Sequence, residues 1–337
     1  MLRHCIVDVS NLVHRSKHGI TNYATVDECI GLLLTIVMNS LKSSQKLFET
    51  DHYVMCFDGG SWRKEYYPDY KGNREKRKEL MNPKEREKED IIHQVMDELE
   101  EYFREYTNVT VLKENKIEGD DFIARWVQLH DMENFEHIII SRDYDFKQLV
   151  KDNISLYDPV SHTLYTTNGV FFKDGRKPAQ GQLTTELYGE TWKVKIEEKT
   201  DKPMVFDPEW ELFFKCIRGD KGDNITSAYP RVTKKKMREA FENKGLVKWN
   251  NFINEKWGSN ENPKHVKELY ERNRLLIDLT KQPDDIKQKM DQAIEKSIER
   301  PKAKMVGAYF AKFCSKYQLI RLAAEGTTFA SILSAEY

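Results

Sequence analysis

The chain of 337 residues predicts an α/β fold built on a parallel sheet, followed by a mostly helical C-terminal part. Short β-rich runs alternate with amphipathic helical patterns of crossover length, which is typical of parallel sheets. A hydrophobic content of 39% is enough to bury a core in one large or two ordinary domains. The last third of the chain carries mainly helical periodicity.

Four runs of branched apolar residues predict the buried parallel strands: CIVDV from Cys5, HYVMCF from His52, VTVL from Val109 and HIII from His137. The helix between the first two strands begins at Thr25, which forms a capping-box pattern with Glu28. A second helix carries apolar residues at helical spacing over 91–106, and a third begins at Glu118. Strands and helices therefore alternate through the first half of the chain.

The pattern changes after Asp152, where ISLY and TLYTT read as hairpin strands. Residues 173–204 match no regular pattern, and we expect an insertion there. A helix is predicted from the Asp207 cap to a stop at Gly219. Further helices are expected from Asn262 and Pro263, over 284–298 and around 305–313. We place a domain boundary at residue 206, between a domain 1–206 and a domain 207–337.

Composition excludes several classes of protein. The 54 basic and 55 acidic residues nearly cancel, so an anionic partner must be attracted by local clusters. Five cysteines form an odd set without a CxxC pair, which indicates reduced thiols and a cytoplasmic location. The nine histidines form no HxxxH or HExxH pair, so zinc is not expected. We find no secretory signal and no apolar run near the roughly 20 residues that span a membrane, so no membrane partner is expected.

Nine carboxylates recur in five groups, mostly where a strand ends or a helix begins: Asp8; Asp58; Glu118, Asp120 and Asp121; Asp143 and Asp145; Asp220 and Asp223. Singly, each is explained as a turn or cap residue. Jointly, they are predicted to converge where ligand sites form, at the carboxyl ends of parallel strands. So many acids cannot all ionise in one site without compensation, and a pair of divalent cations would supply it.

Ligands that are all oxygen select a hard cation such as Mg²⁺, with Mn²⁺ as a substitute. Two such ions about 4 Å apart can activate a water and stabilise the leaving oxygen of a phosphodiester. The acids therefore predict a two-metal nuclease.

A basic and aromatic segment from Phe57 to Lys78 favours nucleic acid as the source of the phosphate. It has seven Lys or Arg against three acids from Arg63 onward, interleaved with tyrosines, as in proteins that bind single strands. Its candidate contacts are Arg63, Lys64, Tyr70, Lys71, Arg74 and Lys78. Lys71 and Arg74 are also candidates for balancing charge at a scissile phosphate. The mixed run KEREKED that follows reads instead as a solvated helix face.

A second basic run follows Asp223 and contains no acid: Arg231, Lys234, Lys235 and Lys236, continuing to Arg238. Contact with the backbone of duplex DNA and a plain helix surface are equally good readings of this run.

Five motifs in order resemble those of the 5′ nuclease (flap endonuclease) superfamily: VDVSNLVHR, FDGGSWRKEYYPDYKGNR, IEGDD, SRDYDFKQL and GDKGDNI. They span Val7 to Ile225, and RNRLLIDL from Arg272 further resembles phage members of the superfamily. The resemblance implies a PIN-like parallel sheet flanked by helices, with a helical arch in 61–90. It also implies a C-terminal helical domain of modified helix-hairpin-helix type that grips duplex DNA.

The resemblance assigns roles to the acids. Asp58, Asp120 and Asp143 would surround a first Mg²⁺, with Asp8 acting through water. Asp145, Asp220 and Asp223 would surround a second, and Glu118 and Asp121 would support the ligands from further out. Lys71 and Arg74 would lie at the base of the arch, and Tyr70 would stack on a base near the cleavage point.

One segment departs from the superfamily pattern. After Ile225 the chain reads TSAYPRVTKKKM, without the glycines of the usual hairpin. Without glycine the backbone amides cannot approach a phosphate or a monovalent ion closely, so we expect lysines to contact the duplex there and do not expect a bound potassium ion.

Together these features predict a magnesium-dependent 5′ to 3′ exonuclease and flap endonuclease acting on branched or nicked duplex DNA and on RNA:DNA hybrids. Its expected task is primer removal in phage lagging-strand replication, as a monomer in the host cytoplasm, with a single-stranded DNA-binding protein or sliding clamp as partner.

Three alternatives stay open. They are a PIN-type ribonuclease, a catalytically silent structure-specific DNA-binding protein, and a HAD-like phosphatase that uses Asp143 and Asp145 as nucleophile and acid.

Overall fold

The computed structural model describes the chain except for residues 17–22, 24, 133 and 260. It divides into two compact units. The first contains Met1–Gly60, Asn82–Val205 and Asp284–Tyr337, and the second contains Ser61–Met81 and Phe206–Pro283. The units are thus interleaved along the chain and differ from the two segments predicted on either side of residue 206. The functional domain assignment stays a prediction.

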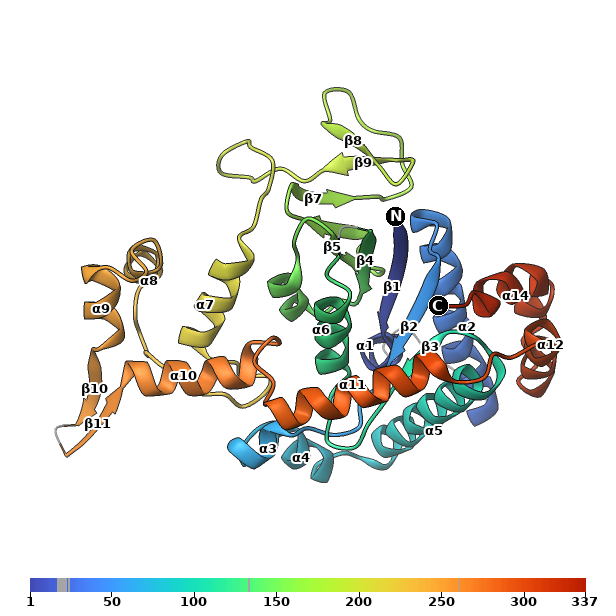
Figure 1. Cartoon of the computed structure of the whole chain (residues 1–337), viewed down its shortest axis with the longest axis horizontal. Coiled ribbons are helices and arrows are strands. Elements are labelled where there is room, and N and C mark those ends of the chain that lie inside the picture. Colours follow the sequence, from blue (N-terminus) through green and yellow to red (C-terminus); the bar gives the residue numbers. More distant parts are fainter. Residues whose placement is uncertain (17–22, 24, 133, 260) are drawn as a thin grey trace. The chain divides into compact units, whose positions relative to one another are not determined.

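The first unit is built on a sheet in which, over the described residues, nine strands follow the order β3-β2-β1-β4-β5-β6-β7-β9-β8 (Figure 1). The strands are β1 Leu2–Asp8, β2 His52–Cys56, β3 Thr110–Leu112, β4 Phe135–Ile140, β5 Ile154–Asp158, β6 Thr163–Thr166, β7 Gly169–Phe172, β8 Thr184–Leu187 and β9 Glu190–Val194. From β3 to β5 neighbouring strands are parallel, and from β5 to β8 they are antiparallel. The predicted α/β fold with a parallel core is confirmed.

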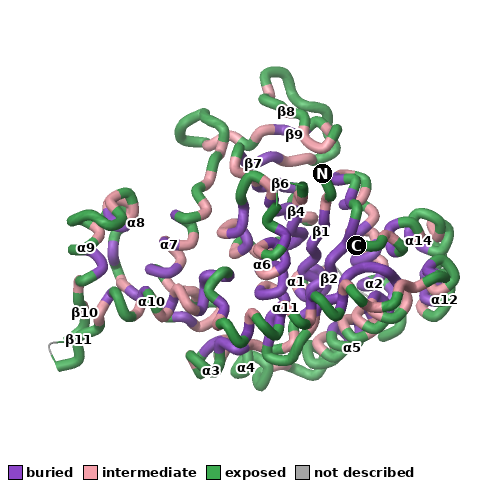
Figure 2. The backbone as a smooth tube through the Cα atoms, viewed as in Figure 1, coloured by how far each residue is buried: buried purple, intermediate pink, exposed green. Residues whose placement is uncertain are grey.

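Helices cover both faces of the parallel part. Helices α1 (Val9–Ser16), α2 (Val26–Phe48) and α5 (Pro83–Tyr106) pack together on one face, while α6 (Gly119–Leu129) and α11 (Asp284–Glu299) lie on the other (Figure 1). Strands β1, β2 and β4 are buried over most of their length (Figure 2), and burial on both faces explains the apolar runs CIV, YVMC and III within them. No helix in the described part of the chain is both long and apolar enough to cross a membrane.

Capping side chains begin three of the helices, and the caps at Thr25 and Asp207 are those that the sequence predicts. The Thr25 side chain accepts a hydrogen bond from the Glu28 amide at 3.2 Å, which begins α2. Asn82 and Glu85 cap α5 reciprocally, each side chain accepting the other residue's amide at 3.0 Å. The cap at Asp207 and the stop at Gly219 bound α7 (Pro208–Arg218), as predicted.

The C-terminal helices belong to the first unit and protect the edge strand β3. Ser297 of α11 accepts the Val111 amide proton and donates to the Val111 carbonyl, both at 3.0 Å. The Arg300 guanidinium donates to the carbonyls of Thr107 and Val109. Beyond it, α12 (Val306–Lys316), α13 (Ile320–Ala323) and α14 (Gly326–Ser334) follow, and α12 and α14 pack against α5 and α2. An open strand edge is therefore covered by side chains from the end of the chain.

The stretch 173–204, which had no sequence-based assignment, adds the β8–β9 hairpin to the sheet. Strand β9 pairs with β7 through Phe171 and Val194, and β8 forms the outer strand. The ISLY and TLYTT segments form the antiparallel pair β5 and β6, as predicted.

The second unit is mainly helical. Its elements are α3 Arg63–Tyr66, α4 Gly72–Glu79, α7, α8 Lys234–Phe241, α9 Val247–Ile253, α10 Val266–Ile277 and the hairpin strands β10 Lys256–Ser259 and β11 Asn262–His265. Its core joins Trp210 and Phe213 of α7 to Met237, Phe252 and Tyr270.

The predicted helix start at Asn262 and Pro263 is wrong. These residues form β11, and Pro263 lies opposite Gly258 in an isolated two-stranded ribbon, where a proline lacking a ladder donor is tolerated. Helix α10 begins only at Val266.

Candidate functional site

The carboxyl ends of the parallel strands bring several predicted acids to one edge of the first unit. Asp8 is the last residue of β1 and lies in register with Cys56, two residues before Asp58. Ile140 ends β4 in register with Val7, so Ser141 and Asp143 emerge beside Asp8. Glu118 and Asp120 follow β3 at the start of α6. Sheet register therefore explains why acids distant in sequence become neighbours.

Asp8 lies deepest among these acids, with 4% of its surface exposed. Its carboxylate accepts hydrogen bonds from the Asn11 amide and the Ser141 hydroxyl, each at 2.9 Å. Burial, followed by repulsion from Asp58 and more weakly from Asp143, raises the pKa of Asp8 to about 7. The neutral donors do not offset this cost, and a cation beside Asp8 would relieve it.

Asp58 is exposed and accepts the amide proton of Gly119 at 2.8 Å. Gly119 has a close-packed position, because a Cβ atom there would lie 3.3 Å from the Asp58 carboxylate. Burial and then the charges of Asp8, Asp120 and Asp58 raise the pKa of the Cys56 thiol well above its usual value. The charges of three acids thus act on the end of β2.

Glu118 and Asp121 are buried and cap α6, since each side chain accepts a backbone amide of the other residue. Their expected role of supporting the metal ligands from further out stays a prediction.

Asp143 begins a short 3₁₀ helix, η1 (Tyr144–Leu149), by accepting the Asp145 amide proton at 2.9 Å. The Asp143 amide in turn donates to the Ser141 hydroxyl oxygen at 2.9 Å. Ser141 therefore links Asp8 to Asp143, a role that the sequence analysis missed. Its position directly after the HIII strand was the available signal.

The donor set fits a hydrated hard cation. Asp8, Asp58, Asp120 and Asp143 offer only oxygen, and repulsion among them favours a bound cation. Within the residues that the structure describes, no three His, Cys, Asp or Glu side chains are grouped as the ligands of one ion. Mg²⁺ uses one or two carboxylates and keeps several waters, so it does not require a closed protein cage.

In the second unit, the GDKGDNI motif folds into a closed loop. Asp220 and Ile225 exchange backbone hydrogen bonds of 2.9 and 2.7 Å. Gly219 precedes the loop with φ +73°, and a Cβ atom there would lie 2.3 Å from the Ile225 carbonyl oxygen. The amides of Gly222 and Asp223 donate to the Asp220 carboxylate at 2.7 and 3.4 Å. Both acids of the motif are thus held on one turn.

The same loop binds the YKGNR segment. Tyr70 donates its hydroxyl proton to the Asp223 carboxylate at 3.1 Å, and the Arg74 guanidinium pairs with that carboxylate at 2.6 Å. The Lys71 amide donates to the Asp223 carbonyl at 2.9 Å. Two motifs about 150 residues apart in sequence therefore meet within the second unit.

Asp220 is paired with Lys215, whose Nζ lies 2.7 Å from Oδ2. Burial opposes ionisation of Asp220, but the Lys215 charge and the donated hydrogen bonds outweigh it and lower the Asp220 pKa. Lys215 was also missed by the sequence analysis. It lies in the last turn of α7, where the helix dipole stabilises a positive charge.

Two residues of the first basic segment differ from their expected placement. Arg63 is 1% exposed and donates to the Leu276 carbonyl at 2.8 Å, with its guanidinium 4.6 Å from the Trp62 ring centroid. The predicted phosphate contact of Arg63 is wrong, because its guanidinium is buried and interacts with a carbonyl and a ring inside the second unit. Tyr70 is 3% exposed and packs in the core, so its ring is not the open stacking surface that was expected.

The other basic residues lie at the surface. Helix α4 has no buried residue and carries Arg74 and Lys78, while Lys64 pairs with Glu75. Lys234, Lys235 and Lys236 form the first turn of α8, where the Thr233 side chain accepts the Lys236 amide. Lys236 also pairs with Glu255 at 2.7 Å. Arg231 has φ +60°, so an arginine takes a left-handed position in the glycine-poor hairpin.

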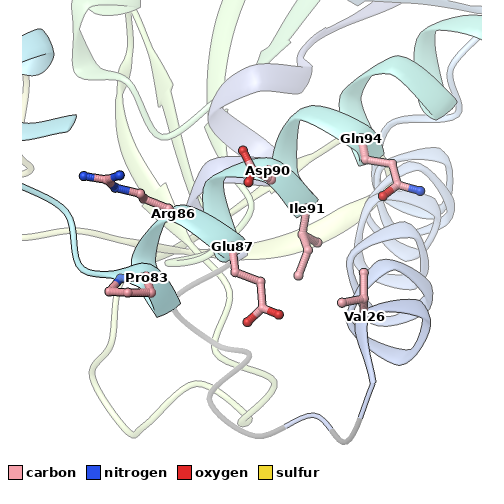
Figure 3. Close-up of a pocket in the computed structure, with 7 residues that line it drawn as sticks. All are labelled: Val26, Pro83, Arg86, Glu87, Asp90, Ile91 and Gln94. Carbon is pink, nitrogen blue, oxygen red and sulfur yellow. The ribbon is translucent and has the colours of Figure 1, made fainter. Parts of the chain in front are cut away.

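A pocket of about 420 Å³ lies between the starts of α2 and α5 (Figure 3). Val26, Pro83, Arg86, Glu87, Asp90, Ile91 and Gln94 line it. None of the predicted acids does, so this pocket is separate from the carboxylate cluster.

Asp8, Asp58, Asp120 and Asp143 are therefore brought together in the first unit, with Asp145 on the next turn of chain. Asp220 and Asp223 are brought together with Tyr70, Lys71 and Arg74 in the second. The ion expected at Asp145, Asp220 and Asp223 stays a prediction.

Known proteins resemble this chain in sequence. Ribonuclease H of Enterobacteria phage T4 is 29% identical over 164 residues, covering 46% of this chain and 52% of that protein. Flap endonuclease Xni of Psychromonas ingrahamii is 28% identical over 178 residues, covering 50% of this chain and 62% of that protein. The chain thus spans only about half to three fifths of the length of these curated relatives.

Solved structures share the fold. A flap endonuclease of bacteriophage T5, described in complex with DNA and metal ions, has a TM-score of 0.60 at 19% identity and covers 88% of this chain and 100% of its own. The T5 5′-exonuclease with bound zinc has a TM-score of 0.59 at 19% identity, covering 88% and 99%. At this identity the likeness establishes the fold.

A family model described as "5'-3' exonuclease, N-terminal resolvase-like domain" matches residues 3–175. The matched segment is more than half of the chain and includes β1, β2, β3, β4 and the acids of the first unit. The protein belongs to this 5′-3′ exonuclease family.

Proposed function

We propose that the protein is a magnesium-dependent 5′ to 3′ exonuclease and flap endonuclease that hydrolyses phosphodiesters of DNA and of RNA in RNA:DNA hybrids. The observation that carries the proposal is the convergence of Asp8, Asp58, Asp120 and Asp143 at one edge of the sheet, with a pKa of about 7 for Asp8. Uncompensated acids are the setting in which a divalent cation is most favourable.

In this proposal Asp58, Asp120 and Asp143 would surround a hydrated Mg²⁺, with one or two of them as direct ligands and the rest acting through its waters, and Asp8 would also act through a water. When bound, the ion lowers the pKa of a coordinated water and offsets charge on the leaving oxygen. Ser141 keeps Asp8 and Asp143 oriented, because it donates to one and accepts from the other. The cap that Glu118 and Asp121 form fixes the start of α6 and therefore the position of Asp120.

Lys71, Arg74, Lys64, Lys78, Arg231 and the lysines at the start of α8 are proposed to attract the phosphates of branched or nicked duplex DNA. The exposure of Arg74 and Lys78 on α4 and of the three lysines on α8 supports this role. The named activities of the T4 and Xni relatives support flap and RNA:DNA substrates, and Mn²⁺ is proposed to replace Mg²⁺.

Primer removal in phage lagging-strand replication is the biological task that we propose. Partnership with a single-stranded DNA-binding protein or sliding clamp, a monomeric state and a host cytoplasmic location stay predictions, as does the second ion.

The central test is cleavage of a 5′-labelled flap and of a nicked duplex with Mg²⁺, with Mn²⁺ and with EDTA. We expect products only with metal, and the new ends should carry 5′-phosphates. Cleavage that persists in EDTA, or no cleavage under any condition, would sink the proposal. A preference for single-stranded RNA would instead favour a PIN-type ribonuclease, and hydrolysis limited to small phosphomonoesters would favour a HAD-like phosphatase.

A second test separates chemistry from binding. Asp143→Asn should abolish cleavage yet bind the flap with nearly unchanged affinity, because the carboxylate serves the ion more than the DNA. Asp97→Asn is the matched control. The Asp97 side chain is 77% exposed on α5, so this variant should cleave at the wild-type rate. Equal loss of binding and cleavage in Asp143→Asn would contradict the assignment, and binding without cleavage by the wild type would favour a silent DNA-binding protein.

A further inference from the structure

An aromatic and basic cluster lies on the same turn as the first-unit acids. Tyr144 sits between Asp143 and Asp145 in sequence and begins η1, with Lys147 one turn later. Tyr165 of β6 completes the cluster, and its ring lies edge-on to Tyr144 with centroids 5.7 Å apart at 66°. None of these three residues has a part in the function proposed above.

The cluster is held tightly at one end and open at the other. The Lys147 ammonium lies 4.6 Å from the Tyr144 ring centroid and 4.5 Å from that of Tyr165. Tyr165 is 6% exposed and pairs with Leu156 and Val170 inside the sheet. Tyr144, in contrast, keeps 47% of its surface exposed. The Tyr144 ring is therefore held by contacts with Lys147 and Tyr165, while much of its surface faces solvent.

The 3₁₀ turn couples this ring to the acids. Residues three apart eclipse in such a turn, which explains why Lys147 lies over Tyr144. Asp143 caps the turn through the Asp145 amide, so the Tyr144 backbone is positioned by the same hydrogen bond that orients Asp143. Tyr144 directly follows Asp143, and adjacent Cα atoms are about 3.8 Å apart, so the two side chains leave the chain from neighbouring positions of the same turn.

We propose that Tyr144 is a stacking surface for the base of one of the two nucleotides that flank the scissile phosphate. Lys147 and Tyr165 act as positioning residues that hold the ring. The inference rests on the proposed nuclease function and deepens it, because it states how the strand is seated beside the acids. Aromatic stacking is independent of base identity, since every base offers a π face.

The chain offers a matched control for a purely structural role. Tyr309 and Lys312 are also three residues apart, with the ammonium 5.8 Å from the ring centroid, and Tyr309 packs against Tyr106 at 4.8 Å. Their helix α12, VGAYFAKFCSK, contains no acid. Tyr309→Ala therefore removes a similar Tyr, Lys and Tyr contact on a helix that carries none of the predicted site acids.

Binding is measured first, in EDTA, by fluorescence anisotropy of a labelled nicked duplex. The duplex carries either natural nucleotides or an abasic residue at one of the two positions flanking the cleaved bond. Wild type should bind the natural duplex about tenfold more tightly than the duplex that is abasic at the stacked position. Tyr144→Ala should lose this preference, Tyr144→Phe should retain it, and Tyr309→Ala should behave as wild type.

Cleavage with Mg²⁺ follows on the same duplexes. Tyr144→Ala should slow cleavage of the natural duplex about tenfold and leave the abasic duplex at its wild-type rate. Equal slowing on both duplexes, no slowing on either, or the same loss in Tyr309→Ala would overturn the inference. A wild type that cleaves nothing would defeat the proposed function, whereas the binding comparison would still decide the role of Tyr144. The abasic preference of the wild type tests the idea even where Tyr144→Ala fails to fold.

Discussion

The acids of the two units are held in opposite ways. In the first unit, the donors to Asp8 and Asp58 are backbone amides and the Ser141 hydroxyl, and the pKa of Asp8 is raised. In the second, Lys215 pairs with Asp220 and Arg74 pairs with Asp223, and the pKa of Asp220 is lowered. The same residue type therefore has an uncompensated charge in one place and a compensated charge in the other.

This difference separates two uses of a carboxylate. A buried acid that keeps a neutral shell and like-charged neighbours destabilises the fold at neutral pH, and it is retained where an added cation makes use of it. An acid paired with lysine or arginine already has its countercharge, and here it joins GDKGDNI to the segment that carries Tyr70 and Arg74. The first-unit acids are thus the stronger candidates for binding metal.

The largest expected effect concerns activity. Asp8→Asn should lower the rate of flap cleavage about 10- to 100-fold, because it removes a charge that supports the proposed ion. Asp223→Asn should lower the rate less, since the Arg74 pair already balances that charge. Single-turnover rates on the same flap check the ranking, and a greater loss in Asp223→Asn would reverse the comparison.

The second prediction concerns pH and stability without metal. Because the folded pKa of Asp8 is raised, the folded state binds the extra proton, and stability falls as pH rises from about 4 to 7. The loss amounts to at most roughly 4 kcal/mol above pH 7. Asp8→Asn should therefore melt like wild type near pH 4 and increasingly higher than wild type up to pH 7, as followed by thermal unfolding in EDTA.

Magnesium sharpens this experiment. Added Mg²⁺ at pH 8 should raise the melting temperature of the wild type and narrow its gap to Asp8→Asn, because binding to the folded state stabilises it. If the difference in melting temperature between wild type and Asp8→Asn does not change with pH or with metal, ionisation of Asp8 does not destabilise the folded state.

The third prediction tests the compensated pair. Arg74→Met and Asp223→Asn should each destabilise the protein, and a double-mutant cycle should give a coupling of about 1 kcal/mol or less, since the Arg74 side chain is 58% exposed. The expected change in stability is opposite in sign to that of Asp8→Asn, which should stabilise the protein at pH 8. Urea unfolding of the four proteins measures the coupling, and a stabilising Asp223→Asn would erase the contrast between the units.

The smallest effect is expected from single lysines of α8. Lys235→Ala should weaken duplex binding slightly and reduce the slope of log affinity against log salt by about 0.9. Lys236→Ala should change the slope less, because Lys236 is already paired with Glu255. Anisotropy titrations at several salt concentrations distinguish the two variants. If both variants have the same slope as the wild type, α8 is an ordinary helix surface that does not contact the duplex.

Local features were the most predictable part of the structure. The strands at Cys5 and His137, the caps at Thr25 and Asp207 and the stop at Gly219 depend on neighbours a few residues away, and all appear as expected. The predicted helix start at Asn262 and Pro263 failed because cross-strand pairing with Ser259 and Gly258 outweighed a local capping signal. The hairpin in 173–204 was not assigned because its outer strand is exposed and lacks a clear apolar pattern.

Long-range partners were not predictable in the same way. From its sequence context Arg63 was predicted to contact phosphate. In the structure its side chain is buried and donates a hydrogen bond to the Leu276 carbonyl, 213 residues away in sequence. Ser141, which joins Asp8 to Asp143, carries no motif of its own. Three histidines without a metal-binding spacing, His4, His52 and His137, come together because β1 lies between β2 and β4 in the sheet. His130 joins them from the end of α6.

By itself the sequence determined the α/β class, the order of the motifs and which acids end strands, because apolar periodicity and cap chemistry act over one or two turns. Only the tertiary structure decided which acids share a charge environment and which receive a lysine or arginine, because register and packing set those distances. The unequal treatment of Asp8 and Asp223 arises at that level, and it is the basis for placing the ion at the first unit.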